Sequence, residues 1–139
     1  MSSLQSLIRI HRWQLDEKRR ALTDLESLSD RLSQEMRRLE EELGRERQSI
    51  NSDPQSAADF AAYLKAVKKR REHLSASKAQ IEQQIAAASK EIAEAYRELK
   101  KFEIAQSDRD RNAHVRLRRR EAAIFDEIAT TGHRRKSGS

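Results

Sequence analysis

Apolar residues recur along most of this chain at alternating steps of four and three, the spacing of a coiled-coil seam. From Leu4 to Ile50, ten of the fourteen seam positions are apolar, and from Phe60 to Phe102 eleven of thirteen are. The positions between them carry most of the charged side chains. Because a 3.5-residue repeat sustained over this length is typical of packed helices, the pattern predicts an all-α coiled coil.

The seam is interrupted once, at Asn51-Ser52-Asp53-Pro54. Pro54 lacks an amide hydrogen and disfavours helix at the preceding residue. Ser56, with Asp59 three residues on, has the pattern of a helix N-cap. A connection this short makes consecutive helices antiparallel neighbours. The sequence therefore predicts an antiparallel two-helix hairpin as a single domain over 1–130, with helix one over about 3–51, a loop over 52–56 and helix two over about 57–130.

Facing seam positions of an antiparallel pair have residue numbers with a constant sum. A sum of 110 gives a register in which no layer is polar on both sides; it pairs Ile50 with Phe60, Leu43 with Val67, Leu15 with Ala95 and Ile8 with Phe102. The same register favours two flanking ion pairs, Glu40 with Lys68 and Glu42 with Arg70.

The second helix is expected to overhang the first. At a sum of 110, Leu4 lies opposite Gln106, and there the seam changes phase by two successive steps of four, a stutter that unwinds the supercoil. Beyond this point the sequence predicts one helix over 107–129 with a thin apolar stripe, a C-cap at Gly132 and a disordered basic tail over 131–139.

Composition excludes several classes of protein. A chain with 37% charged residues, three Gly and one Pro can bury a stripe but no large core. It has no Cys, which excludes disulfides and favours a reducing cytoplasm. No signal-peptide pattern opens the sequence, and no apolar run approaches the ~18 residues of a membrane span. We expect a soluble, intracellular protein.

Catalytic chemistry is also not indicated. The four histidines have no nearby His or Cys at metal-ligand spacing, and no Gly-rich phosphate loop is present. A two-helix hairpin offers no pocket that excludes water. We therefore expect no enzyme activity, no metal and no cofactor.

The remaining candidates are binding surfaces. Residues 104–139 carry nine basic and five acidic side chains and so hold most of the net charge of +6. Arginines line the overhang beside an apolar stripe that includes Ala113, Leu117 and Ile124, which favours partner binding over a merely solvated face. Trp13 with Ile10, and Tyr63 near the hairpin tip, are further candidate contacts, because Trp and Tyr are enriched at interfaces. Trp13 could alternatively lie on the Arg and Lys side chains of its own helix.

Several stretches resemble the FliJ family of alphaproteobacterial flagella. They are Leu7-Ile8-Arg9-Ile10-His11-Arg12-Trp13-Gln14-Leu15-Asp16-Glu17-Lys18-Arg19-Arg20, the loop with Asp53-Pro54, Lys101-Phe102-Glu103 followed by Arg109-Asp110-Arg111, and Asp126-Glu127-Ile128-Ala129. The similarity extends over essentially the whole length, including the short helix, the long helix and the basic tail.

This resemblance implies a non-enzymatic component of the flagellar type III export apparatus, shaped like the central stalk of a rotary ATP synthase. It implies binding and stimulation of the hexameric export ATPase, and contacts with the export gate membrane protein and with export chaperones. It places the protein in the cytoplasm, at the inner-membrane flagellar basal body through its partners. We expect a monomer when the protein is alone.

The resemblance also implies site residues. The end that bears both termini faces the ATPase, and the candidate contacts there are Arg109, Arg116, Leu117, Arg118, Arg119, Arg120, Ile124, Asp126 and Glu127. A surface near the start of the second helix faces the export gate. With the outward aromatic side chains, the candidate partner surface comprises Ile10, Trp13, Tyr63, Val67, Arg70 and Leu74.

Two other functional classes remain open at this stage. A basic coiled coil could bind nucleic acid through phosphates, with strong salt dependence, although the neutral first helix and the lack of interleaved aromatics argue against it. A generic coiled-coil adaptor or scaffold would be expected to dimerise in parallel, without the phase change at Gln106.

Overall fold

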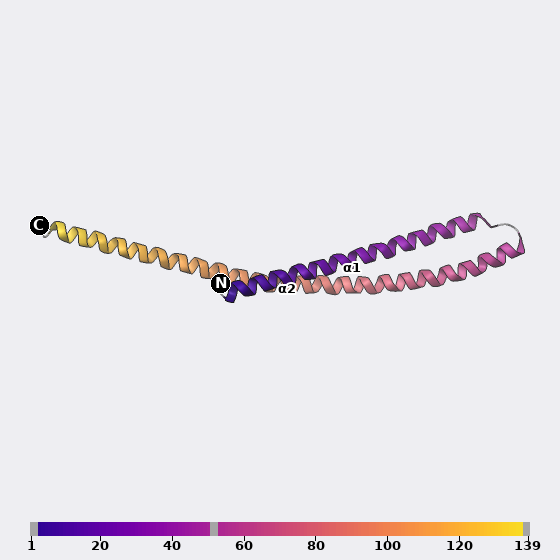
Figure 1. The fold of residues 1–139 in the computed structure, drawn as a ribbon, viewed down its shortest axis with the longest axis horizontal. Helices are drawn as coiled ribbons and strands as arrows, with labels where there is room; N and C mark the ends of the chain where they lie inside the picture. The colour runs from indigo at the N-terminus through magenta and orange to yellow at the C-terminus, as the bar shows by residue number, and fades with distance from the viewer. Residues whose placement is uncertain (1–2, 51–52, 138–139) are drawn as a thin grey trace. The chain divides into compact units, whose positions relative to one another are not determined.

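The computed structural model of the protein describes residues 3–50 and 53–137. These residues form two α-helices, α1 (Ser3–Gln48) and α2 (Pro54–Ser137), with no β-strand in the described part (Figure 1). The predicted all-α hairpin is confirmed. The two helices build two compact units, each with a piece of both helices: unit 1 from Met1–Arg12 and Tyr96–Ser139, and unit 2 from Trp13–Ala95. The single hairpin domain over 1–130 stays a prediction.

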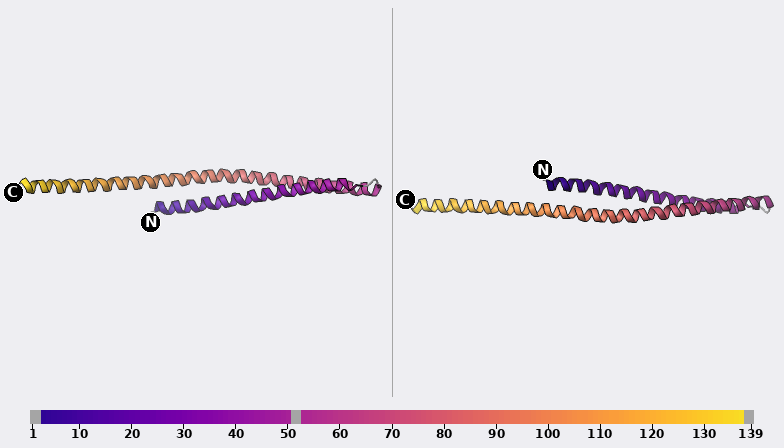
Figure 2. Two further views of the ribbon diagram at one scale, coloured as in Figure 1. Left: turned by 90° about the horizontal axis from the view of Figure 1, so that it is seen from above. Right: turned by 90° about the horizontal axis from the view of Figure 1, so that it is seen from below.

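In unit 2, the pieces of α1 and α2 run side by side in opposite directions (Figures 1 and 2). The buried side chains of this unit are all predicted seam residues: Leu15, Leu43, Val67, Leu74 and Ile81. Most other seam positions are half-buried, and only Glu46, Ile50 and Arg71 are exposed. Each helix has a single neighbour, so one face of most seam side chains stays open to water. The core is therefore a line of contacts rather than an enclosed interior.

Among the described residues of unit 2, three ion pairs cross between the helices. Lys18 Nζ lies 3.5 Å from Glu91, Arg70 lies 3.2 Å from Glu35, and Arg71 lies 2.6 Å from Glu40. The residue numbers sum to 109, 105 and 111, close to the predicted 110.

The predicted partners of two of these residues were wrong. Glu40 pairs with Arg71 rather than Lys68, and Arg70 pairs with Glu35 rather than Glu42. Long arginine side chains reach a carboxylate on a neighbouring turn of the facing helix, which seam spacing alone does not specify. Because these pairs are exposed, each contributes only ~0.2–1 kcal/mol. These ion pairs help to select the register of the two helices, but they add little to the free energy of unfolding.

The first helix ends earlier than predicted, at Gln48 rather than near residue 51. The Ser49 amide donates to the carbonyls of both Arg45 and Glu46 at 3.2 Å, and the Ser49 hydroxyl donates to the Glu46 carbonyl at 3.0 Å. These bonds satisfy carbonyls that the helix end would otherwise leave unpaired. Two basic residues, Arg45 and Arg47, lie in the last turn, where the helix dipole favours them.

The second helix begins earlier than predicted, at Pro54 rather than near residue 57. Asp53 is its N-cap: its carboxylate accepts a 3.3 Å hydrogen bond from the Gln55 amide, and its carbonyl accepts a 3.1 Å bond from the Ala57 amide. The prediction of Ser56 as N-cap was wrong, and Ser56 lies inside the first turn. Proline suits the first helical position because its fixed φ is helical and the amide it lacks has no partner there. Of the predicted loop 52–56, residue 52 lies outside the described residues.

The second helix also extends further than predicted, to Ser137 rather than about 130. Gly132 lies within the helix, and no described glycine has a positive φ, so the left-handed cap expected there is not formed. One glycine costs the helix only about 1 kcal/mol. Arg134, Arg135 and Lys136 occupy the last turn, where the dipole favours cations. The predicted disordered tail is therefore helical up to residue 137, and residues 138–139 lie outside the described part.

Candidate partner surfaces

In unit 1, the first turns of α1 lie against α2. Leu4, Ile8 and Leu99 are buried there. The rings of His11 and Phe102 lie 4.8 Å apart, and Arg12 lies 3.7 Å from Glu103. These contacts seat the beginning of α1 on the stretch of α2 that ends near Gln106.

Gln106 is half-buried. Its side-chain amide donates to Asp110 at 2.9 Å. From residue 107 to 136 every residue is exposed. The predicted phase change therefore falls where α2 loses its partner helix. We call residues 107–136 the free segment.

The free segment is one helix with apolar side chains in water. Leu117, Ile124 and Ile128 are 52%, 56% and 65% exposed, and the neighbouring Phe125 is 77% exposed. At about 100° per residue, the first three fall within about 40° of arc. An amphipathic stripe of this kind normally faces a packing partner, and the described residues supply none.

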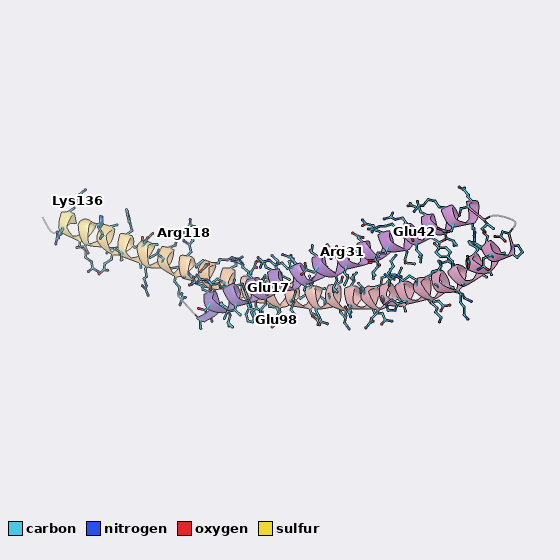
Figure 3. The ribbon with its side chains drawn as sticks, turned by 45° about the vertical axis from the view of Figure 1, so that its right-hand side comes forward. Glu17, Arg31, Glu42, Glu98, Arg118 and Lys136 are labelled. Atoms are coloured by element: carbon cyan, nitrogen blue, oxygen red, sulfur yellow. The ribbon has the colours of Figure 1, made fainter. Side chains whose placement is uncertain are left out.

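The structure brings all nine predicted ATPase-facing residues onto this single exposed helix: Arg109, Arg116, Leu117, Arg118, Arg119, Arg120, Ile124, Asp126 and Glu127. Arg118 and Lys136 project from it (Figure 3). The roles of the nine predicted ATPase-facing residues stay predictions. Sequence reasoning missed Phe125 as a candidate, although its position beside Ile124 and three residues before Ile128 was a usable signal.

Ile10 and Trp13 are both exposed on α1, Ile10 at 50% in unit 1 and Trp13 at 64% in unit 2. An indole this exposed covers little of its own helix. This favours a partner contact for Trp13 over packing on neighbouring side chains.

Tyr63 and Arg70 are accessible near the start of α2. Tyr63 is half-buried, with its ring 6.3 Å from that of Phe60. Partial burial of the phenol raises the pKa of Tyr63 above 10.0, the charges of Glu42 and Glu46 raise it further, and Arg45 opposes them. The side chain of Arg70 is 56% exposed despite its pair with Glu35.

Val67 and Leu74 are not surface residues. They are only 4% and 3% exposed and are core side chains of unit 2. This burial argues against their predicted role as partner contacts, because both are seam positions and the hairpin covers them. A partner could contact them only if the two helices separated.

Among the described residues, no group of three or more His, Asp or Glu is arranged to hold a metal ion. Within the same part of the chain, neither helix has a stretch apolar enough to cross a membrane.

A family model described as Flagellar FliJ protein matches residues 1–138. The chain belongs to the FliJ family. No curated protein and no solved structure matches this FliJ-family chain. Family membership implies that the chain is a component of the flagellar export apparatus.

Proposed function

We propose that this FliJ-family protein binds the hexameric flagellar export ATPase through its free segment and stimulates ATP hydrolysis, as a central stalk does. The observation that supports the proposal is the exposure of all residues from 107 to 136 on an unbroken helix. A helix of this length spans about 45 Å and is about 10–12 Å wide. Those dimensions suit the axial channel of a ring.

Energetics also favour a partner for the free segment. An isolated helix of about 30 residues gains little stability from its own hydrogen bonds in water. Leu117, Ile124 and Ile128 leave apolar surface exposed, at roughly 25 cal/mol per Å² of potential burial. Binding would bury this surface and hold the segment helical. The Arg116 to Arg120 stretch would contribute attraction to an acidic lining.

The same proposal assigns the other partners to the other exposed side chains. Trp13 and Ile10 are candidates for export chaperones, and Tyr63 with Arg70 for the export gate membrane protein. Through these partners the protein would lie in the cytoplasm at the inner-membrane basal body.

A truncation tests the ATPase role. A chain ending at Gln106 keeps the contacts of α1 with α2 and loses the free segment, so it should remain a folded hairpin but no longer raise ATP hydrolysis by the purified ATPase. Equal stimulation by the truncated and full-length chains would contradict the proposal.

Substitutions separate the two forms of attraction. Changing Arg116, Arg118, Arg119 and Arg120 to Gln removes four positive charges, whereas changing Leu117 and Ile124 to Ala removes apolar surface. Loss of stimulation only with the Gln set would indicate an electrostatic contact, and loss only with the Ala set would indicate packing. Changing Lys65, Lys68 and Lys69 to Gln is the control, because these residues are exposed in unit 2 and do not belong to the free segment.

A further inference from the structure

In unit 1, the face of α2 that points away from α1 is rich in positive charge. Phe102 marks the side that packs against α1, since its ring lies 4.8 Å from that of His11. At about 100° per residue, Ile104 lies about 160° around the helix from Phe102. The charged residues between 97 and 119 that lie within about 60° of Ile104 are Arg97, Lys100, Lys101, Asp108, Arg111, Arg118 and Arg119. We call these seven residues, with Ile104 and Val115, the outer face.

The outer face holds the whole positive excess of this stretch. Six of its charged residues are basic and one is acidic, which gives a net charge of +5. The rest of the helix surface between 97 and 119 carries two basic and three acidic residues, a net charge of −1. Every residue of the outer face is exposed. The spacing of the charges therefore creates a basic strip along one side of the helix.

Some of these cations lie near a carboxylate of their own helix. Lys101 lies 3.5 Å from Glu98, and Arg111 lies 3.9 Å from Asp108. The Lys101 and Arg111 side chains nevertheless remain 74% and 72% exposed. Such exposed pairs are weak, so an anionic partner can take the place of the carboxylates.

Apolar side chains lie along the middle of the outer face. Ile104 is 60% exposed, and Val115, three turns later and about 20° around the helix, is 38% exposed. Tyr96 lies at the edge of the face and is 45% exposed, with Lys100 Nζ 5.4 Å from the centre of its ring. Aliphatic side chains flanked by Lys and Arg, with a tyrosine at the edge, suit the boundary between lipid headgroups and acyl chains.

We propose that the outer face binds the surface of a membrane that contains anionic phospholipid, with this part of α2 parallel to the membrane plane. The six cations contact lipid phosphates along about 33 Å of helix, and Ile104 with Val115 enters the headgroup region. This inference goes beyond the proposed function, because the contact needs no protein partner. Arg97, Lys101 and Ile104 also precede the free segment.

Two other partners fit the outer face less well. Nucleic acid supplies phosphates for the cations, but it offers no apolar environment to Ile104 and Val115. A second copy of the chain would bring together two faces that each carry a net charge of +5. The resulting repulsion opposes self-association through this face.

The test is sedimentation of the full-length protein with vesicles of phosphatidylglycerol and phosphatidylcholine. The protein should bind these vesicles, more weakly at high salt, and should bind vesicles of phosphatidylcholine alone far less. No binding to the mixed vesicles at low salt, or equal binding to both kinds of vesicle, would overturn the inference. No ATPase is present in this assay, so its outcome is independent of the proposed function.

Charge variants locate the contact. Changing Arg97, Lys101 and Arg111 to Gln should weaken vesicle binding roughly fivefold for each cation, on the order of 100-fold in total. Arg118 and Arg119 stay unchanged in this variant, because they are also predicted ATPase contacts.

The matched control changes Arg109, Arg116 and Arg120 to Gln. It removes the same charge from the same helix, but these three residues lie about 120–160° from Ile104. The helix is about as wide as the distance over which salt screens charge, so the control should weaken vesicle binding by less than about fivefold. Equal losses for the two sets would overturn the assignment of the contact to one face.

Ile104→Ala distinguishes lipid from nucleic acid. Alanine keeps the charge and favours the helix, and circular dichroism checks that the helical content is unchanged. The variant should bind the mixed vesicles about three- to tenfold more weakly, because less apolar surface enters the headgroup region. Its binding to duplex DNA, measured by fluorescence anisotropy, should equal that of the unaltered protein. If Ile104→Ala binds the vesicles as tightly as the unaltered protein does, the face recognises phosphate alone and the inference is overturned.

Discussion

Replacement of Leu74 by alanine distinguishes a core residue from a partner contact. Leu74 is 3% exposed in unit 2. It is a seam residue and also a predicted partner contact. If its side chain packs between the two helices, Leu74→Ala should destabilise the hairpin. If it were a partner contact, the variant would keep its stability and lose only binding.

The expected loss can be bounded from the structure. Buried Leu→Ala substitutions cost about 2–5 kcal/mol, and the cost falls when neighbouring groups can collapse into the space. In a two-helix pair one side of the seam is open to water, so we expect about 2–3 kcal/mol. Unit 2 has roughly 80 residues, and at about 2.1 cal/mol/K per residue the loss corresponds to a fall in Tm of about 12–18 °C.

Urea unfolding followed by circular dichroism at 222 nm measures this loss directly. Arg70→Ala is the control, because Arg70 is exposed in the same stretch and its ion pair with Glu35 is worth at most about 1 kcal/mol. A change below about 0.5 kcal/mol for Leu74→Ala would refute the assignment of Leu74 to the core and restore it as a candidate contact.

Three further predictions test other parts of the molecule. Cysteines in place of Leu15 and Ala95 should oxidise within one chain in dilute protein, because the predicted register makes these positions face each other, and the chain has no other Cys to compete. Exclusively intermolecular crosslinks on a non-reducing gel would indicate a parallel dimer instead. Trp13→Ala should leave helical content and Tm nearly unchanged while weakening partner capture, since Trp13 is 64% exposed, and a large fall in Tm would place the indole in the fold. In a Tyr96→Phe background, absorbance titration at 295 nm should give Tyr63 a pKa raised above its ordinary value, and Glu42→Gln should lower it; since Tyr63 of the unfolded chain ionises first, the hairpin should lose stability as pH rises through the ordinary pKa of tyrosine, and a Tyr63 pKa that is not raised would contradict this.

The sequence by itself determined which residues face the seam and that the chain reverses once. Both properties are local: a 3.5-residue period sets the buried face of each helix, and Pro54 with a short connection makes the helices antiparallel. The basic character of the last quarter is likewise a matter of composition. The burial of Val67 and Leu74 follows from the same seam pattern, whereas their role as partner contacts stays a prediction that this burial disfavours.

Only the tertiary structure decided where the helices begin and end and which side chains remain in contact with water. Asp53 rather than Ser56 caps α2 because the cap depends on the path of the connection, and Gly132 stays helical because no turn is required there. The partners of Arg70 and Arg71 depend on how long side chains cross between the helices. Phe125 is exposed because α2 continues past the stretch that packs against α1, and no partner helix covers it there. Solvent exposure depends on the neighbours of a residue rather than on its own helix.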